Sequence, residues 1–342
     1  MRSFGSDNNS GVHPDILTAI ERANRDHAIA YGDDSWTEKA KQIIRQNFGE
    51  KANPFFVFNG TGANTIALRA ATQPFHCILA STTAHIAVDE CGAPVFMTGC
   101  SLKEIATKNG KLSPDLLLPH FSHWGFEHHS QPKVVYISQC TELGTVYTIK
   151  EIKALAEFIH QHNLYLHIDG ARLANAAAFL NISLEKMITE TGVDILSFGG
   201  TKNGMMMGEA VISFREELTE NMKYWRKQSA QLFSKMRYTS AQFIAYFEND
   251  LWLKNAAHAN QMAQKLRKGI LQIAPVAFTQ ETEANILLFT LPKIVIEQLQ
   301  EKHFFYVWNE QENEVRLVTS WDTTEEDISS FLNDFDTIMR KI

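Results

Sequence analysis

The first two-thirds of the chain alternates short apolar runs with longer segments in which apolar residues recur at helical spacing. The apolar runs predict buried strands, because strands inside a parallel sheet are covered on both faces. These strands are expected at residues 55–58, 76–80, 134–138, 164–168, 194–198 and 210–214. Helical spacing is expected at residues 63–71, about 84–91 and from 149 onward. This alternation predicts an α/β fold with a large, mostly parallel sheet.

The pattern changes after about residue 215. The expected elements there are a helical stretch over 215–270 interrupted near 235–239, strands at 285–290 and 314–319, and a helix at 293–302. A capping-box spacing, in which a Thr caps the first turn and a Glu reaches back, predicts helix starts at Thr148 and Thr323. We expect a large domain over residues 1–245 and a small α+β domain over residues 246–342.

Composition narrows the class of protein. Hydrophobic residues make up 44% and charged residues 21% of the 342 residues, which excludes a disordered or fibrous chain. A net charge of −7 gives no general attraction for nucleic acid or an anionic membrane. The chain has no apolar run long enough to span a bilayer, and its first nine residues lack the apolar core of a signal peptide. We therefore expect no nucleic-acid or membrane partner.

The four cysteines form no CxxC pair, and so few in a chain of this length predict reduced thiols in the cytoplasm. They are Cys77, Cys91, Cys100 and Cys140.

The first candidate site is the junction of a predicted strand and helix at Gly60, Thr61 and Gly62. Glycines let the backbone approach an anion, and the helix start supplies free N–H groups. The alternatives are a plain tight turn and a dinucleotide-binding loop. A dinucleotide site would need a third glycine and an acidic residue at the end of the next strand, whereas the chain has Asn64 and Thr65 there, and no carboxylate in residues 80–82. A single phosphate therefore fits better.

Two further candidates follow predicted strands. Asp169 stands at the carboxyl end of an apolar strand, the edge where open α/β sheets bind ligands. Lys202 follows another strand among glycines, where desolvation would lower its pKa and make it a nucleophile for a carbonyl. The alternatives are a helix-capping Asp169 and an exposed loop Lys202. Aminotransferase-like enzymes that use pyridoxal 5′-phosphate have the same order along the chain: a phosphate-binding loop, then an Asp, then a Lys.

Five motifs, spread over essentially the whole chain, resemble those of the threonine aldolases. They are Phe4-Gly5-Ser6-Asp7-Asn8, Ala30-Tyr31-Gly32-Asp33-Asp34, His167-Ile168-Asp169-Gly170-Ala171-Arg172, Phe198-Gly199-Gly200-Thr201-Lys202-Asn203-Gly204 and Val315-Arg316-Leu317-Val318-Thr319-Ser320-Trp321. That family belongs to the β-eliminating-lyase-like group of fold-type-I pyridoxal-phosphate enzymes. The resemblance implies a large cofactor domain, a small C-terminal domain and a homotetramer, a dimer of dimers, with active sites between subunits.

The resemblance also implies roles toward the cofactor. Lys202 would form the Schiff base, Asp169 would pair with the pyridine nitrogen, and residues 60–62 would hold the phosphate. His85 would stack on the cofactor ring, although a helix-surface histidine is the alternative. Arg237 would reach the cofactor from a neighbouring subunit, unless it only pairs with an acid nearby.

Substrate contacts are implied in the same way. Ser6, Arg172 and Arg316 match residues that bind the substrate carboxylate or orient the cofactor, and Tyr31 would come from a neighbouring subunit. Each has a plainer alternative: Ser6 as a turn cap, Arg316 as an exposed strand residue and Tyr31 as an interface aromatic. His129 matches a second histidine near the substrate hydroxyl, with His128 as an equal candidate.

The resemblance implies reversible retro-aldol cleavage of L-threonine or L-allo-threonine to glycine and acetaldehyde. The proton acceptor would be His85, His129 or a water molecule. The alternative within the same cofactor class is β-elimination or transamination of a related amino acid.

A different class of function is a metal-binding or sensor protein. Four histidines lie within ten positions, at His120, His123, His128 and His129. Their spacing fits no zinc site well and no cysteine joins them, so a polar loop is the favoured interpretation and no metal is expected.

Overall fold

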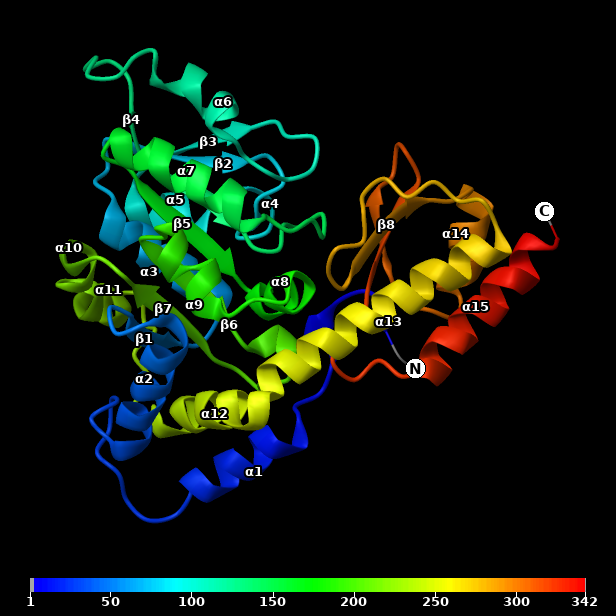
Figure 1. Ribbon diagram of the computed structural model, residues 1–342, viewed down its shortest axis with the longest axis horizontal. Coiled ribbons are helices and arrows are strands. Elements are labelled where there is room, and N and C mark those ends of the chain that lie inside the picture. The colour runs from blue at the N-terminus through cyan, green and yellow to red at the C-terminus, as the bar shows by residue number, and fades with distance from the viewer. Residues whose placement is uncertain (1–2, 342) are drawn as a thin grey trace.

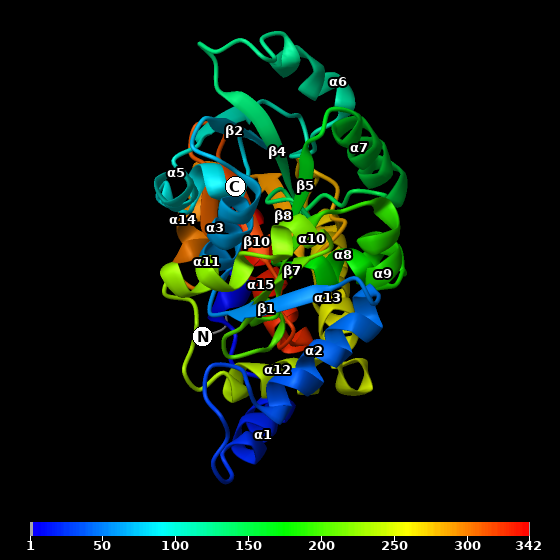
Figure 2. The same ribbon diagram turned by 90° about the vertical axis from the view of Figure 1, so that its left-hand side faces the viewer.

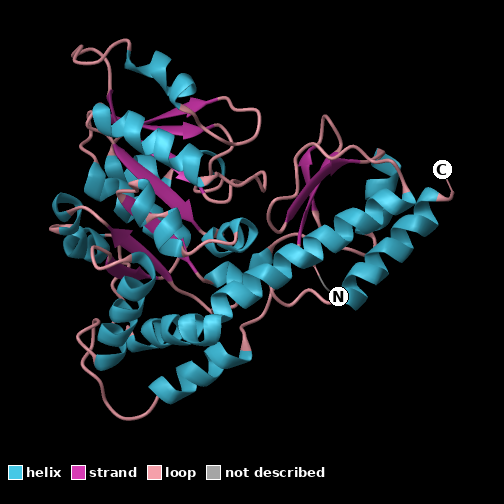
Figure 3. Ribbon diagram, viewed as in Figure 1, coloured by secondary structure: helices cyan, strands magenta, loops and turns pink. Residues whose placement is uncertain are grey.

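The computed structural model describes residues 3–341, and its strands form two separate sheets (Figures 1 and 3). The larger sheet has seven strands in the order β1-β7-β6-β5-β4-β2-β3. The strands are β1 (Asn53–Val57), β2 (His76–Ser81), β3 (Ser101–Ile105), β4 (Gln131–Ser138), β5 (Tyr165–Gly170), β6 (Ile195–Gly199) and β7 (Glu209–Ser213). All neighbours from β3 to β6 pair in parallel, whereas β7 runs antiparallel to both β6 and β1. The predicted mostly parallel sheet is confirmed.

Helices cover both faces of this sheet (Figures 1 and 2). On one face lie α3 (Gly60–Ala71), α5 (Ala93–Thr98) and α11 (Met222–Gln228), and on the other lie α7 (Ile149–Gln161), α8 (Leu173–Leu180) and α9 (Leu184–Met187). The shorter helices of this part are α4 (His85–Val88), α6 (Pro114–Leu117) and α10 (Glu216–Thr219). Below the sheet in Figure 1, α1 (Pro14–Ala23) and α2 (Ser35–Phe48) pack against α12 (Arg237–Phe247).

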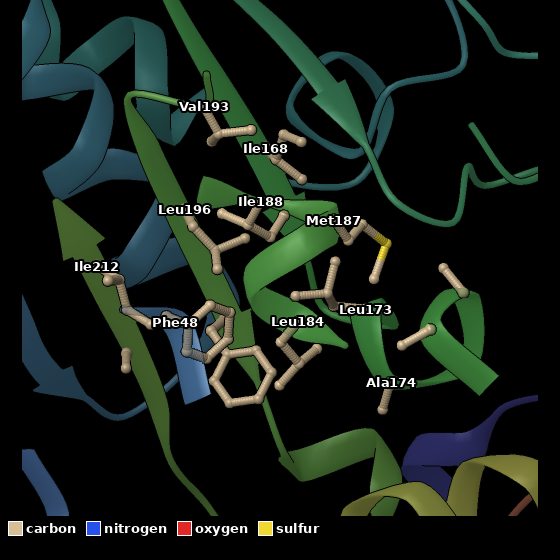
Figure 4. Packing of buried hydrophobic residues seen from close by; sticks show 14 of the residues in the cluster. Phe48, Ile168, Leu173, Ala174, Leu184, Met187, Ile188, Val193, Leu196 and Ile212 are labelled. Atoms are coloured by element: carbon tan, nitrogen blue, oxygen red, sulfur yellow. The ribbon is translucent and has the colours of Figure 1, made fainter. Parts of the chain in front are cut away.

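The alternation of side chains along each strand divides the core between the two faces. On β5, Ile168 points to the cluster shared with α8 and α9, where it packs with Leu173 and Leu196 (Figure 4). Phe48 of α2 extends this cluster, with its ring centroid 5.2 Å from that of Phe198. Asp169, one residue beyond Ile168, therefore projects from the opposite face, the face that α3 covers.

The second sheet has three antiparallel strands in the order β8-β10-β9, with bounds β8 (Ile286–Thr290), β9 (Tyr306–Asn309) and β10 (Glu314–Val318). Its helices are α13 (Leu251–Ile273), α14 (Lys293–Gln300) and α15 (Glu325–Met339). One hydrophobic cluster joins them, and Phe4 of the N-terminal segment belongs to it. The long helix α13 also packs against α8 of the large part, so it connects the two parts (Figure 1).

Several expected elements differ from the structure. The helical stretch expected over 215–270 is interrupted over residues 229–236, earlier than the expected 235–239, because α12 already begins at Arg237. It is broken again at Asn249 and Asp250, which adopt left-handed backbone angles (φ 53° and 55°) between α12 and α13. Asn and Asp tolerate this conformation better than most residues do, and it ends a right-handed helix. The helix expected over about 84–91 is only the short α4, which is capped at Asp89, and the positive φ of Cys91 is incompatible with a helix that continues to residue 91.

The final helix begins one residue later than expected. Its capping box joins Thr324 to Asp327, in place of Thr323 and Glu326. The box predicted at Thr148 with Glu151 is confirmed. The expected domain boundary after residue 245 stays a prediction, and this residue lies inside α12. No helix among residues 3–341 combines the length and the apolar character that crossing a membrane requires.

Candidate active site

Asp169 lies at the carboxyl edge of the large sheet, where polar side chains from several elements meet. Its Oδ2 accepts hydrogen bonds from the Tyr136 hydroxyl (2.6 Å) and Asn64 Nδ2 (2.9 Å), and its Oδ1 accepts one from the Ala171 N–H (2.9 Å). Burial by itself raises the pKa of Asp169, but these hydrogen bonds and the charge of Lys202 together hold that pKa below its usual value. Asp169 is therefore a fixed, ionised carboxylate.

Lys202 follows the neighbouring strand β6 and lies in a 3-10 turn over Thr201–Asn203. Two hydrogen bonds hold this turn against α12 and α13: Asn203 Nδ2 donates to the Tyr246 hydroxyl (2.7 Å) and to the Trp252 carbonyl (2.8 Å). Burial and the positive charge of Arg172 lower the pKa of Lys202. A lysine with a lowered pKa, close to a fixed carboxylate, is a competent amine nucleophile.

Glu209, a carboxyl group that the sequence analysis missed, lies behind this turn. It opens β7 directly opposite Gly199 of β6. A Cβ on Gly199 would lie only 2.3 Å from Oε2 of Glu209, so the glycine leaves room for this side chain. Burial raises the pKa of Glu209 to about 8. The group is therefore largely protonated and uncharged at neutral pH.

His85 begins α4 at the same edge. Its backbone N–H donates to Glu142 Oε1 (2.9 Å), and its ring Nδ1 lies 2.8 Å from Oε1 of Glu90. The hydrogen bond to Glu90 raises the pKa of His85, and nearby Asp169 adds to this effect, while burial and Lys202 oppose it. The ring of His85 thus belongs to the cluster of Asp169 and Lys202.

The start of α3 forms the candidate phosphate cradle. Asn59 caps the helix through its Oδ1, which accepts the Gly62 N–H (2.8 Å). The first-turn N–H groups of an α-helix have no partner within the helix, so those of Gly60 and Thr61 are suited to an anion. The space around Gly60 is open, with no atom within 4 Å of a Cβ placed there, whereas Gly62 lies against the Gln231 side chain.

The two candidate carboxylate-binding arginines differ in what they contact. Arg172 Nε and Nη2 donate to the two carboxylate oxygens of Asp7 at 2.7 and 2.8 Å, so this side of its guanidinium is already used. Arg316 of β10 has a buried Nε without a hydrogen-bond partner, and its guanidinium lies 5.0 Å from the Trp308 ring centroid. Burial and the charge of Arg172 lower the pKa of Arg316 to about 10. Ser6 caps the turn that carries Asp7, where its Oγ accepts the Asn8 N–H.

The groups that meet at this site fit pyridoxal 5′-phosphate. A fixed carboxylate suits a protonated pyridine nitrogen, the buried lysine suits a carbonyl, and the open helix start suits a phosphate. The unpartnered Nε of Arg316 leaves a cation for a substrate carboxylate in the same region.

Three predicted residues lie away from this cluster within one chain. Tyr31 is half exposed, with its N–H bonded to the Ser234 carbonyl (2.8 Å), and Arg237 donates to the Asp26 carbonyl (2.9 Å). His129 is exposed in the loop before β4, where its ring stacks on that of His123. Because β4 and β5 are parallel, the loop before β4 lies at the sheet edge opposite to Asp169.

The histidine-rich loop gives no support to the metal-binding alternative. No group of three or more His, Cys, Asp or Glu residues placed to hold a metal ion occurs within residues 3–341.

Comparison with known proteins identifies the family. A family model described as beta-eliminating lyase matches residues 3–292. The chain belongs to the beta-eliminating lyase family. It is 40% identical, over 99% of its own length and 98% of the relative, to a protein of Pseudomonas aeruginosa named low specificity L-threonine aldolase. The resemblance to threonine aldolases that the five motifs predicted is therefore confirmed.

Solved structures agree with the fold. A threonine aldolase from Leishmania major matches with a TM-score of 0.93 and 30% identity, covering 99% of each chain. Aspartate aminotransferase from Thermus thermophilus matches with a TM-score of 0.71 over 98% of this chain and 90% of that one. At 15% identity this second likeness concerns the fold alone. The predicted aminotransferase-like fold is confirmed.

Sequence reasoning missed the residues that support the cluster: Asn64, Glu90, Tyr136, Glu142 and Glu209. Asn64 and Tyr136 lie far along the chain from Asp169, whereas Glu90 lies only five residues after His85 in a turn that carries no recognisable motif. One signal was available for Tyr136, because its place in an apolar strand pairs with His167 on the next strand and its hydroxyl needs a partner once buried.

Proposed function

We propose that this protein uses pyridoxal 5′-phosphate to cleave L-threonine and L-allo-threonine reversibly to glycine and acetaldehyde. The observation that carries the proposal is the placement of Lys202, a buried lysine of lowered pKa, near enough to the fixed carboxylate Asp169 on the adjacent strand for each charge to shift the pKa of the other. The 40% identity to the low specificity L-threonine aldolase of Pseudomonas aeruginosa supports the reaction class.

Lys202 would attach the cofactor, Asp169 would meet its ring nitrogen, and the start of α3 at residues 60–62 would hold its phosphate. His85 would lie against its ring. Once bound, the cofactor supplies an electron sink for the carbanion that remains when the Cα–Cβ bond breaks.

The protein's own groups select the reaction by orientation. Arg316, whose buried Nε has no hydrogen-bond partner among the described residues, would bind the substrate carboxylate, and Arg172, held by Asp7, adds positive charge beside it. Holding the carboxylate would fix the orientation of the bonds at Cα, and this orientation would decide which of them the bound cofactor activates. His85 is the proton acceptor for the β-hydroxyl of the substrate. Unlike His129, it lies within the Asp169 and Lys202 cluster of its own chain. Ser6 contributes through the turn that carries Asp7.

The assembly belongs to the same proposal. Tyr31, Arg237 and His129 lie outside their own chain's cluster, and we propose that Tyr31 and Arg237 complete the site of a neighbouring subunit in a homotetramer built as a dimer of dimers. His129 would serve the substrate hydroxyl only if a neighbouring subunit brings it there. We also propose a reducing, cytoplasmic location, which suits the four free cysteines, and domains over residues 1–245 and 246–342.

The test of this function is Lys202→Ala. Without the amine, the protein loses covalent attachment of the cofactor, and threonine cleavage falls below about a thousandth of the wild-type rate, which corresponds to about 4 kcal/mol of lost transition-state stabilisation. Glycine and acetaldehyde are measured from L-threonine and L-allo-threonine side by side. Lys254→Ala, at an exposed position of α13, is the control that keeps full activity.

Two results would overturn the proposal. If the Lys202→Ala variant cleaves threonine at the wild-type rate, Lys202 has no catalytic role and the proposal is wrong. Release of ammonia and a keto acid by the wild-type protein, in place of glycine and acetaldehyde, assigns the site to β-elimination or transamination.

A further inference from the structure

A buried carboxylate with no assigned role, Glu90, joins two residues of the candidate site. Its side chain has no exposed surface and lies in the turn between α4 and α5. Its Oε1 is 2.8 Å from Nδ1 of His85 and accepts a hydrogen bond from Nδ2 of Asn64 (2.7 Å). The same Nδ2 donates to Oδ2 of Asp169 (2.9 Å). One hydrogen-bonded chain thus runs from His85 through Glu90 and Asn64 to Asp169.

The arrangement determines which nitrogen of His85 carries hydrogen. A carboxylate only accepts hydrogen bonds, and Asn64 is a donor to the same oxygen, so the contact with His85 requires a hydrogen on Nδ1. The neutral ring therefore keeps its hydrogen at Nδ1 and leaves Nε2 as the free nitrogen.

The charges favour a second proton on that ring. Glu90 and Asp169 are two buried carboxylates joined by a neutral amide, and Oε2 of Glu90 has no hydrogen-bond partner among the described residues. A buried negative charge is costly unless a cation compensates it. The ionisable groups around the ring are Glu90 after α4, Glu142 after β4, Asp169 on β5 and Lys202 after β6. Of these, only Lys202 opposes a charge on His85.

We propose that Glu90 is a positioning residue, which keeps the ring hydrogen of His85 on Nδ1 and leaves Nε2 as the nitrogen that exchanges a proton with the substrate hydroxyl. Below its raised pKa, the His85 ring is a cation that donates from Nε2. Above that pKa, Nε2 accepts the β-hydroxyl proton. The catalytic part of this inference rests on the proposed aldolase function, whereas the state of the ring does not.

The ring state is measured by NMR on cofactor-free protein with 15N-labelled histidine rings. In wild-type protein, the neutral His85 ring carries hydrogen on Nδ1. In Glu90→Gln, which keeps the shape of the side chain and removes its charge, the pKa of His85 falls by about one unit. Glu90→Asp, which keeps the charge, recovers part of the difference.

His160 provides a matched internal control. Its Nε2 lies 2.8 Å from Oδ2 of Asp194, the same distance as between His85 and Glu90, and both histidine side chains are 34% exposed. His160 lies on α7, across the sheet from α3. We therefore expect Glu90→Gln to leave the ring signals of His160 unchanged. Unchanged signals would also show that the variant is folded.

The pH dependence of threonine cleavage by the holoenzyme tests the catalytic part. If His85 accepts the proton, the rate rises as pH passes its pKa, so Glu90→Gln moves this rise to lower pH by the same amount as the NMR titration. The plateau rate also falls, because Nε2 becomes a weaker base. A holoenzyme that does not cleave threonine contradicts the proposed function and leaves the NMR result standing.

The inference on Glu90 is overturned by either of two NMR results. One is a neutral wild-type ring that carries its hydrogen on Nε2. The other is an identical titration of His85 in the wild type and in Glu90→Gln.

Discussion

At the scale of single residues, the candidate site depends on which charged groups are already satisfied. Arg172 is occupied by Asp7, and Asp169 by Tyr136 and Asn64, whereas Arg316 keeps a buried N–H without a partner. Strand ends and glycines made Asp169 and Lys202 predictable from the sequence. The partners were not predictable, because each comes from a distant segment that only the fold brings near.

The first prediction concerns Arg316→Lys. A lysine keeps the positive charge but loses the planar pair of donors that matches a carboxylate. We expect the KM for L-threonine to rise by about ten- to a hundredfold, equivalent to about 1.5–3 kcal/mol, with a smaller change in kcat. Steady-state kinetics measure this, and Arg340→Lys, an exposed residue of the C-terminal segment, leaves KM unchanged. An unchanged KM in the Arg316→Lys variant would show that Arg316 does not bind the substrate carboxylate.

The second prediction concerns Glu209 and pH. Burial raises its pKa from 4.5 to about 8, so between these values the folded protein keeps a proton that the unfolded chain releases. Raising the pH across this window therefore favours unfolding, and the contribution of Glu209 to stability is lost as pH approaches 8. Glu209→Gln, which cannot ionise, makes the free energy of unfolding fall less steeply with pH.

Urea unfolding of cofactor-free protein from pH 5 to 9 measures this slope. Glu216→Gln, which changes an exposed carboxylate at the start of α10, is the control and keeps the wild-type slope. Equal slopes for the wild type and Glu209→Gln would show that Glu209 is not protonated at neutral pH.

At the scale of elements, buried strands were the most predictable feature. Six of the seven strands of the large sheet lie within apolar runs, whereas β3 at the sheet edge is Ser-Leu-Lys-Glu-Ile and has no such signal. Helix breaks were less predictable, because Asn249 and Asp250 tolerate left-handed backbone angles without requiring them, and the same residues also occur inside helices. The register of β6 against β7 was also invisible, although it sets Glu209 beside Gly199.

That register makes Gly199→Ala the third prediction. The added Cβ would lie 2.3 Å from Oε2 of Glu209 and 3.0 Å from the Ala171 Cα, which is backbone and cannot simply rotate away. We expect a loss of about 1–3 kcal/mol in stability and weaker cofactor uptake, because the Lys202 turn begins directly after β6.

Thermal unfolding and the absorbance of bound cofactor measure the two effects. Gly11→Ala is the matched control, since a Cβ there meets no atom within 4 Å, and it changes stability by less than about 0.5 kcal/mol. If Gly199→Ala behaves as Gly11→Ala does, the close approach to Glu209 is not a constraint on the site.

At the scale of the whole molecule, the N-terminal segment joins both sheets. Asp7 bonds to Arg172 of the large part and accepts a hydrogen bond from Asn285 beside the small sheet (3.0 Å). The Phe4 N–H donates to the Phe304 carbonyl, and the Phe4 carbonyl accepts from the Val318 N–H. The sequence predicted strands on both sides of residue 245, but not that residues 4–7 lie between the two sheets, because no local pattern encodes contacts between segments so far apart in the chain.

Asp7→Asn is the fourth prediction. It leaves the buried Arg172 without its charge partner, and removing one member of a buried ion pair costs about 3–5 kcal/mol. Urea unfolding of cofactor-free protein measures the loss, with Asp15→Asn on the exposed side of α1 as the control. A loss below about 1 kcal/mol would mean that the pair is not a structural link between the two parts.

The placement of this segment also bears on biosynthesis. Asp7 leaves the ribosome long before Asn285 and Val318, the residues that hold its segment against the small sheet. The large sheet is complete at Ser213, so its strands can pair while the rest of the chain is still being translated. Residues 4–7 are thus synthesised well before the small sheet but are fixed against it only after translation has passed residue 318.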